Sequence, residues 1–153
     1  MVFDTSKIIW IYAKNLLSFY LDTCIWRDFY EARFGQRGNP LGKYAGSFFS
    51  KLIKDKTTIY FSDHNIIELR IAYGDNEVNE MFNLLFFIGM LKKADVKKED
   101  YAGARKISAE RGVPPADALH ALIARNCKAI MVTRDRHFEQ LKDIVEIKKP
   151  EEI

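Results

Sequence analysis

PPADALHALIARNCKAIMVTRD, residues 114–135, is the stretch that decides the fold of this 153-residue chain. Two prolines, which a first helical turn tolerates, precede an apolar helix, and the run AIMV then has the composition of a buried strand. A helix of roughly ten residues travels about 15 Å, and a strand of four or five residues returns about 13–16 Å. We therefore expect Asp117, near the start of the helix, and Asp135, after the strand, at the same edge of a sheet.

Strands and helices alternate along the rest of the chain as well. Strands are expected at residues 18–23, 57–61, 94–96, 129–132 and 144–147. Helices are expected between them at residues 26–33, 43–54, 63–73, 77–89 and 99–111. This alternation predicts an α/β fold with a parallel sheet covered on both faces. The length predicts one domain, at residues 18–153, preceded by an extension at residues 1–17.

Two further acidic residues occupy positions related to strand ends. Asp22 follows the first strand in FYLDTCIW, and Glu68 lies in the second turn of the helix after the second strand. The helix that carries Glu68 is expected to pack on the sheet through Ile66, Ile67, Leu69 and Ile71. Sites in parallel sheets form beyond the carboxyl ends of the strands. We therefore expect Asp22, Glu68, Asp117 and Asp135 to meet in one pocket.

Four clustered carboxylates favour a hard divalent cation. Like charges at close range protonate unless a cation compensates them, and Mg²⁺ and Mn²⁺ prefer oxygen ligands. Such an ion activates water and stabilises charge on a phosphoryl group, so the pattern favours metal-dependent phosphodiester hydrolysis. The net charge of +3 is compatible with a polyanionic partner. The sequence contains no glycine-rich phosphate loop and no Ser–His–acid or Cys–His order.

The histidines and cysteines predict neither a transition-metal site nor a disulfide. No histidine is expected as a transition-metal ligand: His64 and His137 are interpreted as solvated, and His120 as a packed helix residue. Cys24 and Cys127 form no CxxC pair, so neither a zinc site of that kind nor a disulfide is expected. No targeting or membrane-spanning segment is recognised. A reducing, cytoplasmic location is the simplest expectation.

Four strings together resemble the PIN domain, the nuclease domain of VapBC-type toxins and related ribonucleases. They are YLDTCIW, IIELR, PPADALHALIA and VTRDRHF, and the resemblance covers residues 18–147. It implies a three-layer α/β/α sandwich around a short, mainly parallel sheet, with Mg²⁺- or Mn²⁺-dependent cleavage of single-stranded RNA. Carried over residue by residue, it assigns the metal site and catalysis to Asp22, Glu68, Asp117 and Asp135.

The resemblance also implies partners and substrate contacts. Small toxins of this family are homodimers held by a cognate antitoxin whose tail blocks the site. Thr133 matches a hydroxyl residue found just before the last acid, where it hydrogen-bonds a carboxylate or water, or simply closes the strand. Independently of the resemblance, the positions of Arg134, Arg136 and Lys142 in the sequence place them near the pocket, where they either hold RNA phosphates or belong to an ordinary charged surface.

Two departures from the family pattern keep alternatives open. A further acid two residues after the last one is common in the family, but His137 stands there. This favours a leaner metal site and leaves room for a degenerate module that binds RNA or protein without cleavage. An RNA-processing or DNA-directed PIN nuclease is a further alternative. The string VFDTS at residues 2–6 imitates the first-strand motif, so Asp4 competes with Asp22 as the first acid.

Overall fold

Five parallel strands form the centre of the fold. The structure is a computed structural model that describes residues 4–153, apart from the side chains of residues 11 and 13–15. The strands are β1 (Ser18–Leu21), β2 (Thr58–Phe61), β3 (Leu91–Lys93), β4 (Ile130–Val132) and β5 (Ile147–Lys148). They lie in the order β3-β2-β1-β4-β5, so β1 is central and pairs with both β2 and β4.

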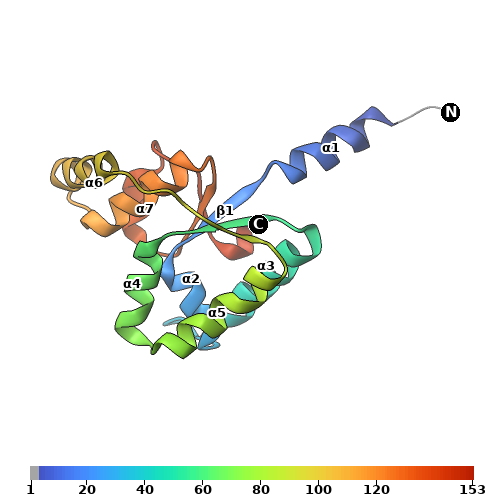
Figure 1. Ribbon diagram of the computed structural model, residues 1–153, viewed down its shortest axis with the longest axis horizontal. Helices are drawn as coiled ribbons and strands as arrows, with labels where there is room; N and C mark the ends of the chain where they lie inside the picture. Colours follow the sequence, from blue (N-terminus) through green and yellow to red (C-terminus); the bar gives the residue numbers. More distant parts are fainter. Residues whose placement is uncertain (1–3) are drawn as a thin grey trace.

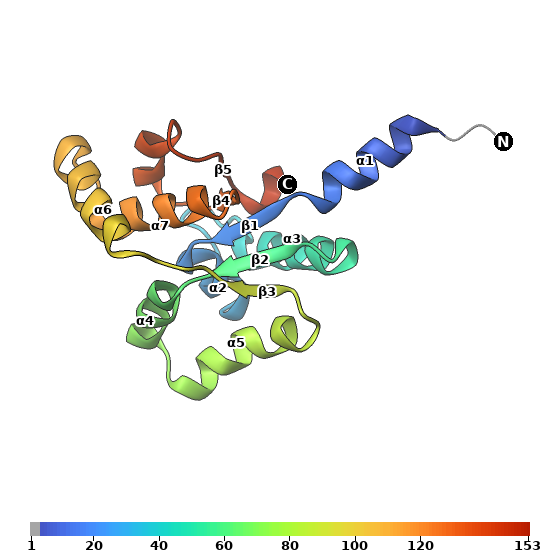
Figure 2. The same cartoon turned by 45° about the horizontal axis from the view of Figure 1, so that its top comes forward.

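Helices cover both faces of the sheet, as Figures 1 and 2 show. One face carries α2 (Thr23–Tyr30), α3 (Leu41–Asp55), α4 (Asp63–Ala72) and α5 (Asp75–Phe87). The other carries α6 (Lys98–Arg111), α7 (Pro115–Asn126) and the 3₁₀ helix η1 (Arg136–Leu141). A second 3₁₀ helix, η2 (Pro150–Glu152), contacts α3. The predicted three-layer α/β/α sandwich with a parallel sheet is confirmed.

The central strands are buried on both sides. In β1, Phe19 and Leu21 join the core under α2, α3 and α5, whereas Tyr20 joins the core under α7. In β4, Val132 and Met131 divide between the two cores in the same way. Because successive strand residues point to opposite faces, two separate cores require an unbroken apolar run in each central strand.

Several details of the predicted elements are wrong. The helix expected at residues 26–33 is α2 (Thr23–Tyr30), and the strand expected at residues 144–147 is β5 (Ile147–Lys148). The third strand is Leu91–Lys93 rather than residues 94–96, because β3 is an edge strand whose lysines face solvent and break the apolar pattern. Helix α4 packs on the sheet through Leu69, with Ile66 partly buried, but Ile67 and Ile71 are 56% and 84% exposed. These two residues are four apart, so they share the outer face of the helix.

The segment before the sheet forms helix α1 (Thr5–Asn15), which projects from the body of the molecule (Figure 1). Asp4 precedes this helix and accepts a hydrogen bond from the backbone of Ser6 at 3.1 Å. Thr5 and Ser6 of the string VFDTS are helical, so the alternative in which this string forms the first strand is wrong for these two residues. Val2 and Phe3 lie outside the described residues. No helix within residues 4–153 is long and apolar enough to span a bilayer.

Candidate functional site

Asp22 is fixed at the carboxyl edge of the central strand. It follows β1 directly, and its backbone N–H donates to the carbonyl of Val132 in β4 at 2.9 Å. Its side chain is buried and accepts a hydrogen bond of 2.6 Å from the hydroxyl of Thr133. The same hydroxyl accepts a 3.1 Å bond from the backbone N–H of Asp135. Thr133 therefore couples the first and last acids of the sequence pattern.

Asp117, Asp135 and His137 form a compact group, which we call the acid cluster. Asp117 lies in the first turn of α7, and Asp135 caps η1 by accepting the backbone N–H of His137 at 2.9 Å. The Nδ1 atom of His137 lies 3.0 Å from Asp117 Oδ2 and 3.1 Å from Asp135 Oδ1. One ligand atom from each of the three side chains lies within 4.8 Å of the others. The helix and strand lengths thus bring Asp117 and Asp135 together as expected.

The charges of this region are poorly compensated. Burial, with the nearby carboxylates of Asp135 and Asp22, raises the pKa of Asp117 from 3.8 to about 6, although His137 opposes the shift. The side chain of Asp117 is only 14% exposed, so solvent screens the repulsion weakly. Three mutually repelling carboxylates at one sheet edge are a donor set that a divalent cation stabilises.

Glu68 has different partners from the other three acids. Its Oε1 atom lies 2.5 Å from Nε2 of His120 and 3.2 Å from Nε2 of His64. We call His64, Glu68 and His120 the histidine cluster. Burial raises the pKa of Glu68, but the hydrogen bond and charge of His120, together with smaller contributions from Thr23 and His64, hold the pKa below its usual value. A hydrogen bond from Thr23, the neighbour of Asp22, acts in the same direction. The four acids therefore share one edge but divide between two groups.

The partners of Glu68 correct the interpretation of two histidines. His120 is 1% exposed, but it bonds Tyr20 and Glu68 instead of merely packing, and His64 is only partly exposed. His137 is half-exposed, as expected, yet it bridges two carboxylates. A signal for His64 was present, because His64 and Glu68 are four residues apart on one helix face. The approach of His120 from another helix had no sequence signal.

The two predicted substrate-binding arginines differ in their environment. Arg134 donates to Asp28 at 3.0 Å and to Glu151 at 2.8 Å, and its guanidinium lies over the ring of Tyr44. These contacts join α2, α3 and η2 to the residue before Asp135, so Arg134 is engaged structurally. Arg136, by contrast, is exposed next to the acid cluster.

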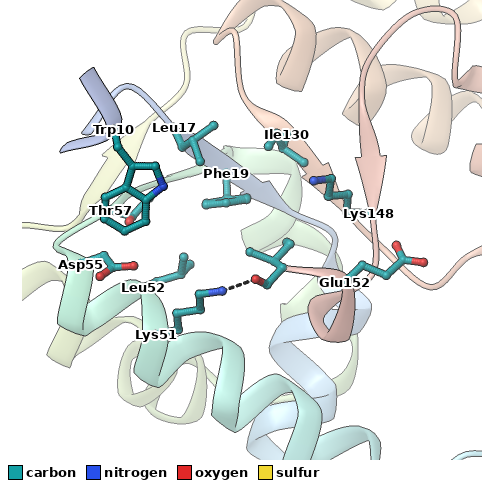
Figure 3. A pocket seen from close by; sticks show the side chains of 11 residues that line it. Trp10, Leu17, Phe19, Lys51, Leu52, Asp55, Thr57, Ile130, Lys148 and Glu152 are labelled. Carbon is teal, nitrogen blue, oxygen red and sulfur yellow. Dashed lines mark hydrogen bonds between the residues drawn. The ribbon is translucent and has the colours of Figure 1, made fainter. Parts of the chain in front are cut away.

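Two cavities mark opposite ends of the strands. A polar cavity of about 620 Å³ adjoins the acid cluster and includes Asp135, Arg136, Lys142 and Lys149 in its lining. An apolar cavity of about 420 Å³ lies where β1, β2 and β4 begin, between Trp10 of α1, Phe19 and Leu52 (Figure 3). Of these two, the polar cavity combines carboxylates with cationic side chains next to the carboxyl ends of the strands. It is therefore the better candidate for a hydrolytic site.

A sequence model of the PIN domain matches residues 19–144, which covers both clusters and all five predicted acidic and hydroxyl positions. The comparison with curated protein sequences gives no significant match.

Solved structures support the same fold. The VapBC2 complex from Rickettsia felis, bound to a DNA fragment from its promoter, matches with a TM-score of 0.60 and 17% identity over 87% of this chain and 98% of that chain. FitAcB from Neisseria gonorrhoeae matches with a TM-score of 0.55 and 19% identity over 88% and 99%. FitAB bound to an IR36 DNA fragment matches with a TM-score of 0.57 and 19% identity over 88% and 96%. At these identities the likeness concerns the fold.

Proposed function

Because the chain belongs to the PIN-domain family, we propose that it is an endoribonuclease that hydrolyses single-stranded RNA with Mg²⁺ or Mn²⁺. The observation that carries the proposal is the convergence of Asp22, Asp117 and Asp135 on one sheet edge. Burial and repulsion from Asp135 and Asp22 raise the pKa of Asp117 to about 6, and a divalent cation would relieve that repulsion. Neither fold stability nor helix capping requires three carboxylates in one place.

Each residue of the site has a role that follows from its contacts. Asp22, Asp117 and Asp135 would hold the ion, and the Thr133 hydroxyl fixes the carboxylate of Asp22. A bound divalent ion lowers the pKa of a coordinated water and stabilises charge on the phosphate. Glu68 would orient the attacking water, since a carboxylate with a lowered pKa is an acceptor at neutral pH.

The polar cavity supports a path for the RNA backbone. Arg136 and Lys142 line it and are exposed, so they can meet phosphates without losing an internal partner that fixes the fold. Arg134 also lines the cavity, but its two carboxylate partners favour a supporting role in which it holds the segment before Asp135. Phosphate contacts of Arg136 and Lys142 would make the affinity for RNA fall as the salt concentration rises.

We also propose a cognate antitoxin as the protein partner of a cytoplasmic toxin. The VapBC and FitAB structures that match this fold are assemblies bound to DNA. An apolar cavity of about 180 Å³ between α2, α3 and α5 offers a place for an apolar side chain of such a partner. Exposed Ile71 and Phe87, on α4 and α5, support a homodimer, because large apolar side chains gain from burial in a subunit contact.

The proposal is tested with purified protein, single-stranded RNA and DNA of the same sequence, and Mg²⁺ or Mn²⁺. We expect RNA cleavage that stops on addition of a chelator and is lost in Asp22→Asn. Cleavage of DNA alone would favour the DNA-directed alternative. RNA binding without cleavage would favour the degenerate module. Equal residual activity in wild type and Asp22→Asn would contradict catalysis at this site.

A further inference from the structure

The histidine cluster has the donor set of a transition-metal site. His64 and Glu68 are four residues apart on α4, and His120 approaches from α7. The two contacts with Glu68 Oε1 measure 2.5 Å from His120 Nε2 and 3.2 Å from His64 Nε2. One ligand atom from each of the three side chains lies within 4.8 Å of the others. Two imidazole nitrogens and one carboxylate form a common ligand set for Zn²⁺.

One nitrogen of the cluster is left without a hydrogen bond. The Nε2 atom of His64 is buried and makes no hydrogen bond with any described residue, although it lies 3.2 Å from Glu68 Oε1. Buried polar atoms without a partner are uncommon in folded proteins, and a bound ion is one way in which such an atom is satisfied. A cation between the three side chains would give this nitrogen a partner.

A second set of bonds fixes the orientation of His120. Its Nδ1 atom lies 2.6 Å from the hydroxyl of Tyr20, which lies 2.8 Å from the hydroxyl of Ser62. Ser62 is itself fixed, because it caps α4 by accepting the backbone N–H of Asn65. Without an ion, Nε2–H donates to Glu68; with an ion bound, Nδ1 would donate its proton to Tyr20 and Nε2 would present its lone pair to the ion. Metal-binding histidines are oriented by this kind of outer bond.

We propose that Nε2 of His64, Nε2 of His120 and the carboxylate of Glu68 form a binding site for Zn²⁺. Ligand atoms around tetrahedral zinc are separated by about 3.4 Å, so small side-chain shifts from the observed separations suffice. A cavity of about 370 Å³ reaches His64 between α4 and the segment before α6, so one side of the proposed site lies next to solvent-accessible space. The site differs from the acid cluster in having two nitrogen donors for one carboxylate.

This inference goes beyond the proposed function, because the zinc site exists whether or not the chain cleaves RNA. Glu68 is the one residue common to both proposals. Zinc bound by His64 and His120 would hold the Glu68 carboxylate and withdraw it from the attacking water. That consequence alone rests on the proposed function.

The test measures Zn²⁺ binding by calorimetry in the double variant Asp117→Asn/Asp135→Asn, which removes the carboxylates of the acid cluster. We expect one equivalent of Zn²⁺, and an affinity lower by about tenfold or more when His64→Gln or His120→Gln is added. His137→Gln in the same background is the matched control and should leave the affinity unchanged. Co²⁺ at the site should give the visible absorption of a four-coordinate ion with nitrogen and oxygen ligands.

Failure of zinc binding can be distinguished from loss of nuclease activity and from misfolding of a variant. Zinc binding is measured in a background without the carboxylates needed for cleavage, so an inactive nuclease can still bind Zn²⁺. His64 is partly exposed, so His64→Gln keeps the test valid if substitution of buried His120 prevents folding, and thermal melts check both variants. An absence of Zn²⁺ binding in the double variant, or equal binding after His64→Gln, would overturn the proposal.

Discussion

The acid cluster and the histidine cluster lie at the same sheet edge but balance their charges in opposite ways. The acid cluster has two carboxylates for one histidine, and the pKa of Asp117 rises to about 6. The histidine cluster has one carboxylate for two histidines, and the pKa of Glu68 falls. The acid cluster is therefore destabilised by repulsion between its carboxylates. The histidine cluster is stabilised by the attraction between Glu68 and its histidine neighbours. The first favours a cation whenever its carboxylates are ionised, whereas in the second His120 already offsets the charge of Glu68.

Removal of an acid from the acid cluster should give the largest effect. Asp117→Asn should lower RNA cleavage by about 10³-fold, because a lost metal ligand costs several kcal/mol of transition-state stabilisation. The same substitution should stabilise the metal-free protein at pH 7 by about 1–2 kcal/mol, because it removes a buried, repelled charge. Cleavage rates and urea unfolding with chelator measure the two effects.

Asp143→Asn is the matched control for this variant. Asp143 is exposed and pairs with Arg111 at the surface, so its loss should change stability by less than about 1 kcal/mol and leave cleavage intact. If Asp117→Asn destabilises the metal-free protein, the carboxylate stabilises the fold and the contrast between the clusters fails.

Substitution in the histidine cluster should have the opposite effect on stability. His120→Phe should destabilise the protein by about 2 kcal/mol, because Glu68 and Tyr20 both lose a buried hydrogen-bond partner. His137→Phe, in the acid cluster, should change stability by no more than about 0.5 kcal/mol because its ring is half-exposed. Chemical denaturation of both variants makes the comparison, and equal losses would show that the two groups do not differ as described.

The pH dependence of stability should report Asp117 separately. Its folded pKa of about 6 lies above its unfolded value of 3.8, so the folded state binds the proton more tightly. The metal-free protein should therefore lose about 1–3 kcal/mol through this group as pH rises from about 4 to about 6. Subtraction of the same profile for Asp117→Asn isolates the contribution. Mn²⁺ affinity should fall below pH 6, and an affinity that is flat from pH 5 to 7 would exclude Asp117 as a ligand.

The smallest expected effect concerns RNA binding beside the acid cluster. Arg136→Ala should weaken RNA binding a few-fold and reduce the salt dependence by about one phosphate contact. Arg125→Ala, at the far end of α7, is the control and should change neither quantity. Filter binding at several salt concentrations measures both variants. Equal effects would mean that charge over the whole surface, and not the polar cavity, attracts RNA.

The sequence predicted the positions that depend on element length and strand ends. Asp117 and Asp135 meet because the helix between them runs away from the sheet edge by about the same distance as the following strand returns. Asp22 lies where a buried strand ends. The bond between Glu68 and His120 could not be predicted, because it depends on how α4 and α7 pack across 52 residues of sequence. The orientation of α4 was missed for the same reason, since Ile67 and Ile71 look like core residues until the helix is placed on the sheet.

The central position of β1 has a consequence for the timing of synthesis. Asp22 emerges early from the ribosome, but the strand that precedes it takes its second neighbour from β4, more than 100 residues later. Pairings of such long sequence separation form late in folding, because a large loop must close first. A nascent chain would therefore lack the proposed metal site until residues near 135 have left the exit tunnel. The proposed activity would then begin only after β4 and the acid that follows it have folded onto β1.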